Sequence, residues 1–351
     1  MIGEVDPKTH EEVNQVKFLG RCIRRNADGY TWEADEKHVK ILLEEHGMQE
    51  CKPLNLPMSR EGSDAAVQDR AALPPMELKD ATQFRRSAAR LNYLALDRPD
   101  LAVAVNRLAR CMSDPRVGDD IPLKRVLRYL KMHRSVQMRF DFQPENLEIC
   151  ALSDSDWAGC RVSRKSTTGF AVFIGSHLLQ FGSKMQKSIA LSSGEAELVA
   201  QTSAICEGLA LGNLLGEFGW KMHISSKCDS SAARGILSRI GVGRIKHLEI
   251  RHLWVQDLVQ NGQVTVSWIP RARNPADSLT HVSAEFATHM QNLSLQFCTD
   301  SALSAMSEGG VADCLCHLTV AVFGSSENRA GAHTPTFHGS GASFVLRFFA
   351  L

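Results

Sequence analysis

Four acidic residues stand out because each lies where a predicted strand ends or a predicted helix begins: Asp154, Glu197, Asp229 and Asp277. Asp154 follows the short apolar stretch 149–152, which is typical of a buried strand, so its carboxylate is expected where that strand emerges at the sheet edge. This placement suits a metal ligand. A Ser-Asp-Ser-Asp sequence is also a frequent turn whose side chains bond their own backbone, so the local sequence leaves both interpretations open.

Glu197 belongs to the start of a predicted helix. Ser192 and Glu195 have the spacing of a capping box, in which each side chain bonds a free backbone N–H at the helix start. This gives Glu195 a structural role. Glu197 has no such role and is free to project toward a neighbouring element.

The other two acids have similar positions. Asp229 directly follows a predicted strand over 222–228, as Asp154 follows its own strand. Asp277 lies in the opening turn of a helix with Asn274 as the N-cap and Pro275 at the first helical position. An aspartate there is also favoured by the helix dipole alone, so a purely structural role remains an alternative.

Composition sets broad limits. The chain has 351 residues and a formal net charge of +1, so it has room for two domains, and its overall charge favours no class of partner. Its ten cysteines include no Cys-x-x-Cys pair, which favours free thiols in a reducing compartment. The first residues lack the order of a signal peptide, and no apolar run approaches the roughly 18 residues that span a bilayer. We therefore expect an intracellular protein, cytoplasmic or nuclear, without a transmembrane segment.

Basic residues are unevenly distributed. The stretch 121–140 contains six Lys or Arg residues and no acid, and the stretch 157–194 contains five and no acid. Such runs usually form solvated faces; the alternative is a path for nucleic-acid phosphates. Within the first stretch, the predicted helix 123–132 places its basic side chains away from an apolar stripe.

The first 140 residues predict short strands followed by helices. Strands are expected over 16–23 and 30–33, and a helix over 35–45 that Gly47 ends. The stretch 54–75 is rich in Pro, Ser, Asp and Ala without periodicity, which is typical of a linker. Further helices are expected over 80–95, 99–112 and 123–132.

From residue 147 the pattern predicts an α/β unit. Three strands, the first ending at Asp154 and the others over 168–174 and 178–183, have connections that demand antiparallel pairing. The remaining elements are a helix over 191–218, a strand over 222–228, helices from 230 and over 247–260, a strand over 263–269 and a helix from 275. The order is β-β-β-α-β-α-α-β-α.

Seven sequence blocks in register resemble the ribonuclease H domain of copia-type LTR-retrotransposon Pol polyproteins, over about residues 147 to 282. The blocks are Ser153-Asp-Ser-Asp-Trp-Ala-Gly-Cys, Ser163-Arg-Lys-Ser-Thr-Thr-Gly-Phe, Ser183-Lys-Met-Gln-Lys, Ala190-Leu-Ser-Ser-Gly-Glu-Ala-Glu, Cys228-Asp-Ser-Ser-Ala, Lys246-His-Leu-Glu-Ile-Arg and Asn274-Pro-Ala-Asp-Ser-Leu-Thr. The resemblance implies a ribonuclease H-like fold, in which a mixed β-sheet of three antiparallel strands followed by parallel strands is flanked by helices.

The resemblance extends toward the N-terminus. Residues 90–108 and 124–131 are similar to the segment that joins polymerase and ribonuclease H in such elements, and 16–48 looks like the end of the reverse transcriptase region. The family's Tyr-x-Asp-Asp turn is absent and the loop-like Asp119-Asp120 is no replacement, so we expect no polymerase activity. The expected division is a partial reverse transcriptase end over 1–60, a linker over 61–79, a helical connection over 80–140, the ribonuclease H-like domain over 147–282, and a poorly ordered tail over 283–351.

The resemblance implies that the four acids bind two divalent ions, Mg²⁺ or alternatively Mn²⁺. Hard oxygen ligands suit Mg²⁺, and two ions about 4 Å apart can activate a water and stabilise the leaving oxygen of a phosphodiester. Without metal, converging carboxylates repel one another and their pKa values rise. Asp156 and Glu195 are alternative ligands; we rank them lower because Glu195 caps its helix and Asp156 lies beyond the expected strand end.

The implied substrate is the RNA strand of an RNA–DNA hybrid, gripped through its backbone and sensed through 2′-hydroxyls. Candidate contacts are Arg161, Arg164, Lys165, Lys184 and Lys187, with Ser166 and Thr167 as polar contacts. His247 matches the family's Lys-His pair, but no catalytic histidine is assigned. The rest of a retroelement polyprotein is the expected protein partner. The alternative function is an inactive remnant that at most binds nucleic acid: a binder needs the basic residues and a nuclease needs the acids as well.

Overall fold

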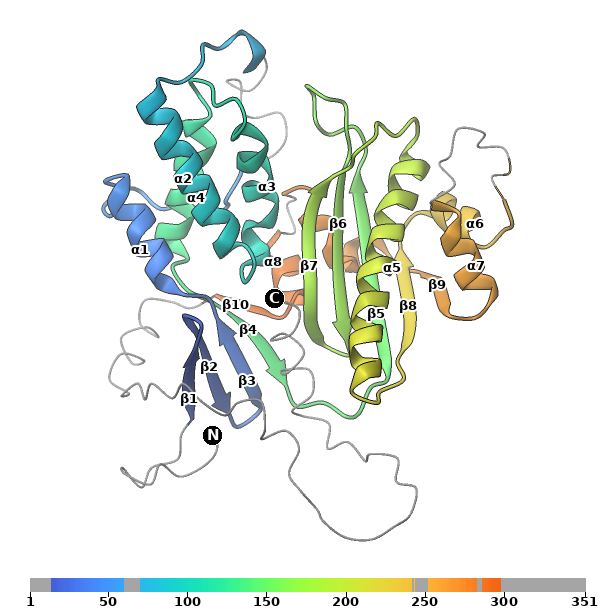
Figure 1. Ribbon diagram of the computed structural model, residues 1–351. Coiled ribbons are helices and arrows are strands. Elements are labelled where there is room, and N and C mark those ends of the chain that lie inside the picture. The colour runs from blue at the N-terminus through green and yellow to red at the C-terminus, as the bar shows by residue number, and fades with distance from the viewer. Residues whose placement is uncertain (1–13, 60–69, 242, 244–251, 283–285, 298–351) are drawn as a thin grey trace.

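The structure is a computed structural model that describes residues 14–59, 70–241, 243, 252–282 and 286–297. Its strands form two five-stranded sheets, with a group of helices beside the first sheet and a long helix across the second (Figure 1). The order in the first sheet is β1-β2-β3-β4-β10, and the order in the second is β7-β6-β5-β8-β9.

The first sheet is antiparallel throughout. Its strands are β1 (Gln15–Phe18), β2 (Arg21–Asn26), β3 (Gly29–Glu33), β4 (Val136–Asp141) and β10 (Leu295–Phe297). The single strand predicted over 16–23 is wrong, because the chain reverses at Leu19 and Gly20. Both of these residues have positive φ, which is the conformation of a tight hairpin turn.

The helices beside this sheet match the predicted ones closely. They are α1 (Glu36–Glu45), α2 (Leu78–Leu94), the short 3₁₀ helix η3 (Pro99–Leu101), α3 (Ala102–Cys111) and α4 (Asp120–Met132). A further 3₁₀ turn, η2 (Arg70–Ala72), lies within the predicted linker. In the Asp119-Asp120 stretch, predicted to be loop-like, Asp119 is the N-cap residue of α4, without a side-chain cap bond, and Asp120 is its first residue.

The basic face of α4 is partly neutralised in the folded chain. Lys124 pairs with Asp120 at 2.7 Å, and Lys131 lies 3.9 Å from Glu50. The apolar stripe is buried as predicted. These acids lie outside the basic stretch in sequence, so the structure favours an ordinary solvated face over a phosphate contact for α4.

A buried polar network ties the helices together. Arg98 is fully buried and bonds the carboxylate of Asp100 with an Nη2–Oδ2 distance of 2.7 Å, and the hydroxyl of Tyr129 donates to the same carboxylate at 2.8 Å. Arg21 pairs in the same way with Asp97 at 2.8 Å, which joins the first sheet to the helices. Buried charges are tolerated because each has a partner.

The second sheet has the directions predicted from the sequence. Its strands are β5 (Glu148–Asp156), β6 (Thr167–Ile174), β7 (His177–Met185), β8 (His223–Cys228) and β9 (Val264–Trp268). The pairs β5–β6 and β6–β7 are antiparallel, whereas β5–β8 and β8–β9 are parallel. This mixed sheet with its flanking helices is the ribonuclease H-like architecture.

The helices of this part follow the predicted order. They are α5 (Ser193–Glu217), α6 (Ser231–Leu237), α7 (Trp254–Gln260) and the 3₁₀ helices η5 (Arg271–Arg273) and η6 (Pro275–Leu279). The predicted helix over 247–260 is described only in part, because 244–251 lie outside the described residues. Asn274 caps η6 by accepting from the N–H of Ala276, as expected, although the helix is of the 3₁₀ type.

Helix α5 is the one described helix that is long and apolar enough to cross a membrane by length and composition. The helix reaches this length with polar residues among the apolar ones, and the absence of a transmembrane segment stays a prediction. Half of the apolar window is buried, and α5 packs against β5, β6 and β8 (Figure 1). The core helix of a globular domain has the same composition, so this is weak evidence for a membrane span.

Residues 286–297, predicted as part of a poorly ordered tail, are folded. They form α8 (Phe286–Asn292), which packs on η6, and β10, which pairs with β4 of the first sheet. Phe286, Met290 and Leu293 are buried. These apolar residues explain the difference, because they complete a core that the preceding elements leave open.

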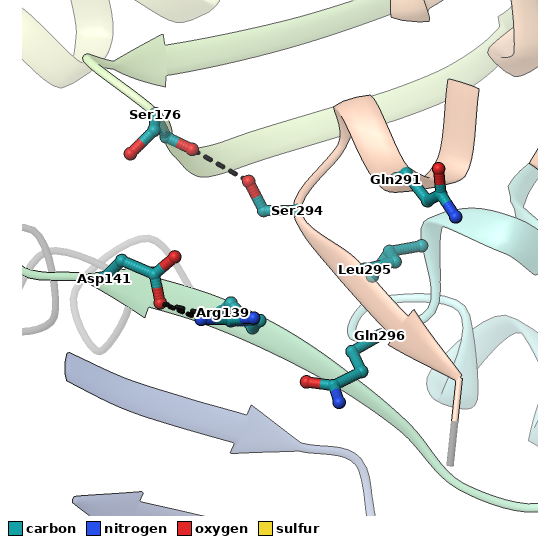
Figure 2. Close-up of a pocket in the computed structure, with 7 residues that line it drawn as sticks. All are labelled: Arg139, Asp141, Ser176, Gln291, Ser294, Leu295 and Gln296. Carbon is teal, nitrogen blue, oxygen red and sulfur yellow. Dashed lines mark hydrogen bonds and ion pairs between the residues drawn. The ribbon is translucent and has the colours of Figure 1, made fainter. Parts of the chain in front are cut away.

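A crevice lies where the two sheets meet near β10. Arg139 and Asp141 of β4 form one wall, and Ser176, Ser294 and neighbouring residues of α8 and β10 form the rest (Figure 2). The hydroxyl of Ser294 donates to the carbonyl oxygen of Ser176 at 2.8 Å across it. None of its lining residues belongs to the predicted acidic site.

Candidate metal centre

Asp154 lies inside β5, not at its end as predicted. It pairs with Gly169 of the antiparallel neighbour β6, and this pairing continues as far as Asp156. The parallel pairing of β5 with β8 stops earlier, at Leu152. Asp154 therefore projects just beyond the end of β8 while its own strand continues, and only 5% of its surface is exposed.

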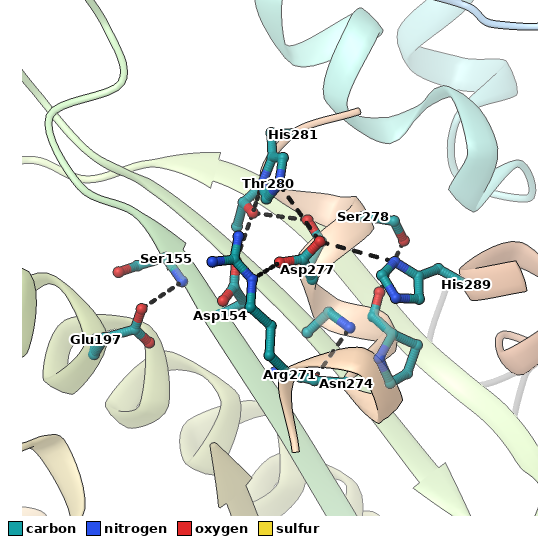
Figure 3. A network of polar contacts seen from close by, with 12 residues as sticks. Asp154, Ser155, Glu197, Arg271, Asn274, Asp277, Ser278, Thr280, His281 and His289 are labelled. Carbon is teal, nitrogen blue, oxygen red and sulfur yellow. Dashed lines mark hydrogen bonds and ion pairs between the residues drawn. The ribbon is translucent and has the colours of Figure 1, made fainter. Parts of the chain in front are cut away.

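Glu197 and Asp229 lie close to Asp154. One carboxylate oxygen from each of the three residues lies within 4.8 Å of the others. Glu197 comes from the second turn of α5, and Asp229 from the connection between β8 and α6. The backbone N–H of Ser155 donates to Oε1 of Glu197 at 3.3 Å, and within the described chain the buried Oε2 has no hydrogen-bond partner (Figure 3).

Asp277 approaches Asp154 from η6. Asp154, Asp277 and His281 form a second group whose ligand atoms lie within 4.8 Å of one another. Two hydrogen bonds tie η6 to β5: Thr280 Oγ1 donates to Asp154 Oδ2 at 2.6 Å (Figure 3), and Asn274 Nδ2 donates to the carbonyl of Ser153 at 2.8 Å. The four predicted acids are thus brought together, with Asp154 common to both groups.

Three basic side chains surround Asp277, which is 2% exposed. Arg271 Nε lies 3.0 Å from Oδ1, His281 Nε2 lies 3.5 Å from Oδ2, and His289 Nδ1 lies 3.8 Å from Oδ2. Sequence reasoning missed both histidines. His281 had a detectable signal, since it is four residues after Asp277 in a helical turn, whereas His289 lay beyond the recognised motifs.

The buried carboxylates hold protons more tightly than usual. Burial, and then repulsion from Asp277 and Asp229, raises the pKa of Asp154 to about 6. Burial, and then repulsion from Asp154, raises the pKa of Glu197 to about 8, and burial also raises the pKa of Asp229. Such carboxylates are costly to bring together as anions without a cation.

The donor set fits a divalent cation. Carboxylate oxygens are the ligands that Mg²⁺ and Mn²⁺ prefer, and the partnerless oxygen of Glu197 is available to one. The lower-ranked Glu195 is engaged at the helix start, where its N–H donates to Ser192 Oγ at 3.2 Å and its Oε2 accepts from the N–H of Leu191 at 2.7 Å. Asp156, at the end of β5, belongs to neither group of close ligand atoms. The role of the four acids as ligands stays a prediction.

The basic side chains predicted to contact nucleic acid differ in how exposed they are. Arg161, Arg164 and Lys187 are exposed, and Lys165 is half-buried. Lys184 is exposed but pairs with Glu207 at 2.9 Å. The first three are therefore the most accessible cations of the set.

Ser166 and Thr167 are not accessible, so the prediction that they contact a nucleic acid is not supported. Their exposed fractions are 0% and 3%. Ser166 Oγ accepts from the N–H of Ala158 at 3.0 Å, which closes the loop between β5 and β6. His247 lies outside the described residues.

Comparison with known proteins relates the chain to transposon polyproteins. It is 32% identical over 278 residues to the retrovirus-related Pol polyprotein from transposon RE1 of Arabidopsis thaliana, covering 78% of this chain and 18% of that polyprotein. It is 28% identical over 276 residues to the Pol polyprotein from transposon TNT 1-94 of Nicotiana tabacum, covering 76% and 20% respectively. The chain thus spans about a fifth of the length of these relatives. No protein-family model matches it.

A shorter relative is matched over most of its own length. The chain is 33% identical over 180 residues to an uncharacterized mitochondrial protein of Arabidopsis thaliana, covering 51% of this chain and 71% of that protein.

Two solved structures are similar to part of the chain. LC11-RNase H1, isolated from compost, is 17% identical with a TM-score of 0.31 and covers 38% of this chain and 92% of its own. RNase H1 of Halobacterium salinarum is 17% identical with a TM-score of 0.29, covering 40% and 98% respectively. Because both TM-scores are low, the fold is assigned from the strand order and strand directions of the second sheet.

Proposed function

This chain belongs to the family of copia-type retrotransposon Pol polyproteins, and from that premise we propose that it hydrolyses the RNA strand of RNA–DNA hybrids in a metal-dependent reaction. The coarse assignment, a nuclease domain of ribonuclease H type, agrees with the family and the fold. The observation that carries the finer proposal is the convergence on Asp154 of Glu197, Asp229 and Asp277 from three other parts of the chain.

The proposed site would hold two divalent ions. Asp154, Glu197 and Asp229 would hold one, and Asp154 with Asp277 would hold the other; His281 lies beside the second group. Bound there, the ions would supply Lewis-acid stabilisation of the phosphate and an activated water.

The chain's own residues prepare this site. Thr280 donates to Asp154 and fixes its orientation, while Arg271 bonds Oδ1 of Asp277. In the metal-free protein at neutral pH, Glu197 keeps its proton because its pKa is raised to about 8. That proton must leave when a cation binds, so metal affinity should increase with pH.

The proposed substrate is gripped through its backbone. The exposed Arg161 and Arg164 in the loop after β5 and Lys187 after β7 supply cations that are suited to phosphates. Polymerase activity is not proposed, since the sequence contains no Tyr-x-Asp-Asp turn. The rest of a Pol polyprotein is the proposed partner.

The test is cleavage of a labelled RNA strand within an RNA–DNA hybrid, with Mg²⁺ or with a chelator. We expect Mg²⁺-dependent cleavage whose rate falls by more than about a hundredfold in Asp154→Asn. This loss exceeds the about 10–100-fold loss that is usual for residues that only support a metal ligand. The matched control is Asp257→Asn, which removes an exposed carboxylate of α7 and should cleave normally. Cleavage that survives Asp154→Asn contradicts the proposal, and hybrid binding without cleavage by the folded wild type favours the inactive remnant.

A further inference from the structure

His289 of α8 is a buried histidine whose ring nitrogens make no hydrogen bond to the part of the chain that the structure describes. Its exposed fraction is 2%, and within the described residues neither Nδ1 nor Nε2 has a hydrogen-bond partner. Burying an unpaired polar nitrogen costs about 1–3 kcal/mol, so such a residue in an apolar helix face calls for an explanation. Its Nδ1 faces Asp277 Oδ2 at 3.8 Å (Figure 3).

The other two bases around Asp277 are placed differently. Arg271 bonds Oδ1 and is 68% exposed, and His281 is 22% exposed. Both side chains therefore reach solvent, and Nδ1 of His281 also lies 3.0 Å from Thr280 Oγ1. His289 lies at the buried side, where Met290 and Phe286 of the same helix are packed in the core. Of the three bases it is the one that is almost fully buried.

We propose that His289 is a positioning residue for Asp277, which fixes the carboxylate by donating a hydrogen bond from Nδ1 to Oδ2 when the site is loaded with metal. This rests on the proposed function. A hydrogen bond of about 2.9 Å requires a movement of only about 1 Å from the present distance. Partners of ligating carboxylates of this kind typically contribute about 10–100-fold to metal affinity.

The proposal gives α8 a part in the metal site. Because α8 packs on η6, the segment that carries Asp277, the helix supports both the backbone and the side chain of this acid. The supporting residue comes from beyond the sequence motifs that identify the domain.

The test is calorimetric titration of the full chain with Mg²⁺ and Mn²⁺. His289→Leu keeps the volume and removes the donor, and we expect it to raise the metal Kd by about 10–100-fold. His289→Asn keeps an N–H near the position of Nδ1 and should stay within about threefold of wild type. Met290→Leu, a conservative change at a fully buried neighbour, controls for altered packing of α8 and should bind normally.

The outcomes separate this inference from the proposed function. Wild-type affinity in a folded His289→Leu variant overturns the inference alone, as does an equal loss in Met290→Leu. No metal binding by wild type, or binding that Asp154→Asn leaves unchanged, overturns the proposed function and this inference with it. If His289→Leu does not fold, His289→Asn is compared with His289→Gln. The Gln side chain places its N–H donor near the position of Nε2, so the inference requires tighter metal binding by the Asn variant.

Discussion

At the scale of single residues, Asp154 and Glu197 couple stability to pH. Their pKa values are raised in the folded chain to about 6 and about 8, whereas in the unfolded chain both lie near about 4. From about pH 4 to about pH 8 the folded state therefore holds more protons than the unfolded state, so the free energy of unfolding falls as the pH rises. The carboxylates favour a cation for the same reason.

We predict that Glu197→Gln removes much of this loss of stability in metal-free protein. Near pH 5 the variant and wild type should have similar melting temperatures, and near pH 8 the variant should be more stable by about 5 °C or more. Mg²⁺ should raise the melting temperature of wild type at pH 8 and have a much smaller effect on the variant. The measurement is thermal unfolding across pH with and without Mg²⁺; a difference between the two proteins that does not change with pH contradicts the raised pKa of Glu197.

A second prediction concerns the buried Arg98. Replacing it by Met leaves Asp100 buried without its cation, so we expect a loss of about 3–5 kcal/mol in the free energy of unfolding. Adding Asp100→Leu should recover part of this loss, because two apolar side chains at these positions need no counterion. Denaturant unfolding of the two variants checks it, and a double variant less stable than the single one would show that the charge is not the cause.

At the scale of elements, the approach of η6 to β6 decides whether the acids meet. Gly169, which pairs with Asp154 across the sheet, lies against η6 so closely that an added Cβ would be 2.6 Å from the carbonyl oxygen of Ala276. A backbone contact of this kind cannot be relieved by a side-chain rotation. The absence of a side chain at position 169 therefore sets the distance between β5 and Asp277.

Gly169→Ala should displace η6 and with it Asp277. A displacement of about 1 Å can lower a rate by about a hundredfold, so we expect weaker metal binding and cleavage reduced by between ten- and a hundredfold. The control is Gly216→Ala near the end of α5, where a Cβ meets nothing within 4 Å, so this variant should bind metal and cleave normally. Titration and hybrid cleavage measure both; normal metal affinity in Gly169→Ala would show that η6 is not held by this contact.

At the scale of the whole molecule, the segment 286–297 joins the two sheets. Its helix α8 packs behind η6, and its strand β10 pairs with β4, which precedes the second sheet in the chain. The proposed domain boundary at 282 would cut this connection. It would also uncover the core around Met290 and Leu293, which are fully buried.

We predict that a chain ending after residue 282 is much less stable than one ending after residue 297. Loss of a single large buried side chain costs about 2–5 kcal/mol, and this truncation removes several, so its melting temperature should fall by more than about 10 °C. Its metal affinity should fall as well, because Asp277 loses the support of α8. Thermal unfolding and metal titration of the two chains test this, and equal stability would support the boundary at 282.

The sequence by itself determined the features that depend on local patterns. The capping of α5 by Ser192 and the start of η6 at Asn274 follow from the chemistry of helix ends, and both are found in the structure. The antiparallel directions of β5, β6 and β7 follow from their connections, whereas the parallel strands were implied by the motif blocks in register that identified the family. These signals also identified Asp154, Glu197, Asp229 and Asp277, since each acid lies in a recognisable block.

Only the tertiary structure decided what depends on contacts between distant segments. Asp154 lies inside a strand because β6 continues to pair with β5 where β8 stops, and Ser166 is buried because the loop after β5 folds back over it. His289 reaches Asp277 because α8 packs against η6. Which residues become neighbours depends on the packing of elements far apart in sequence, and local periodicity and spacing do not encode that packing.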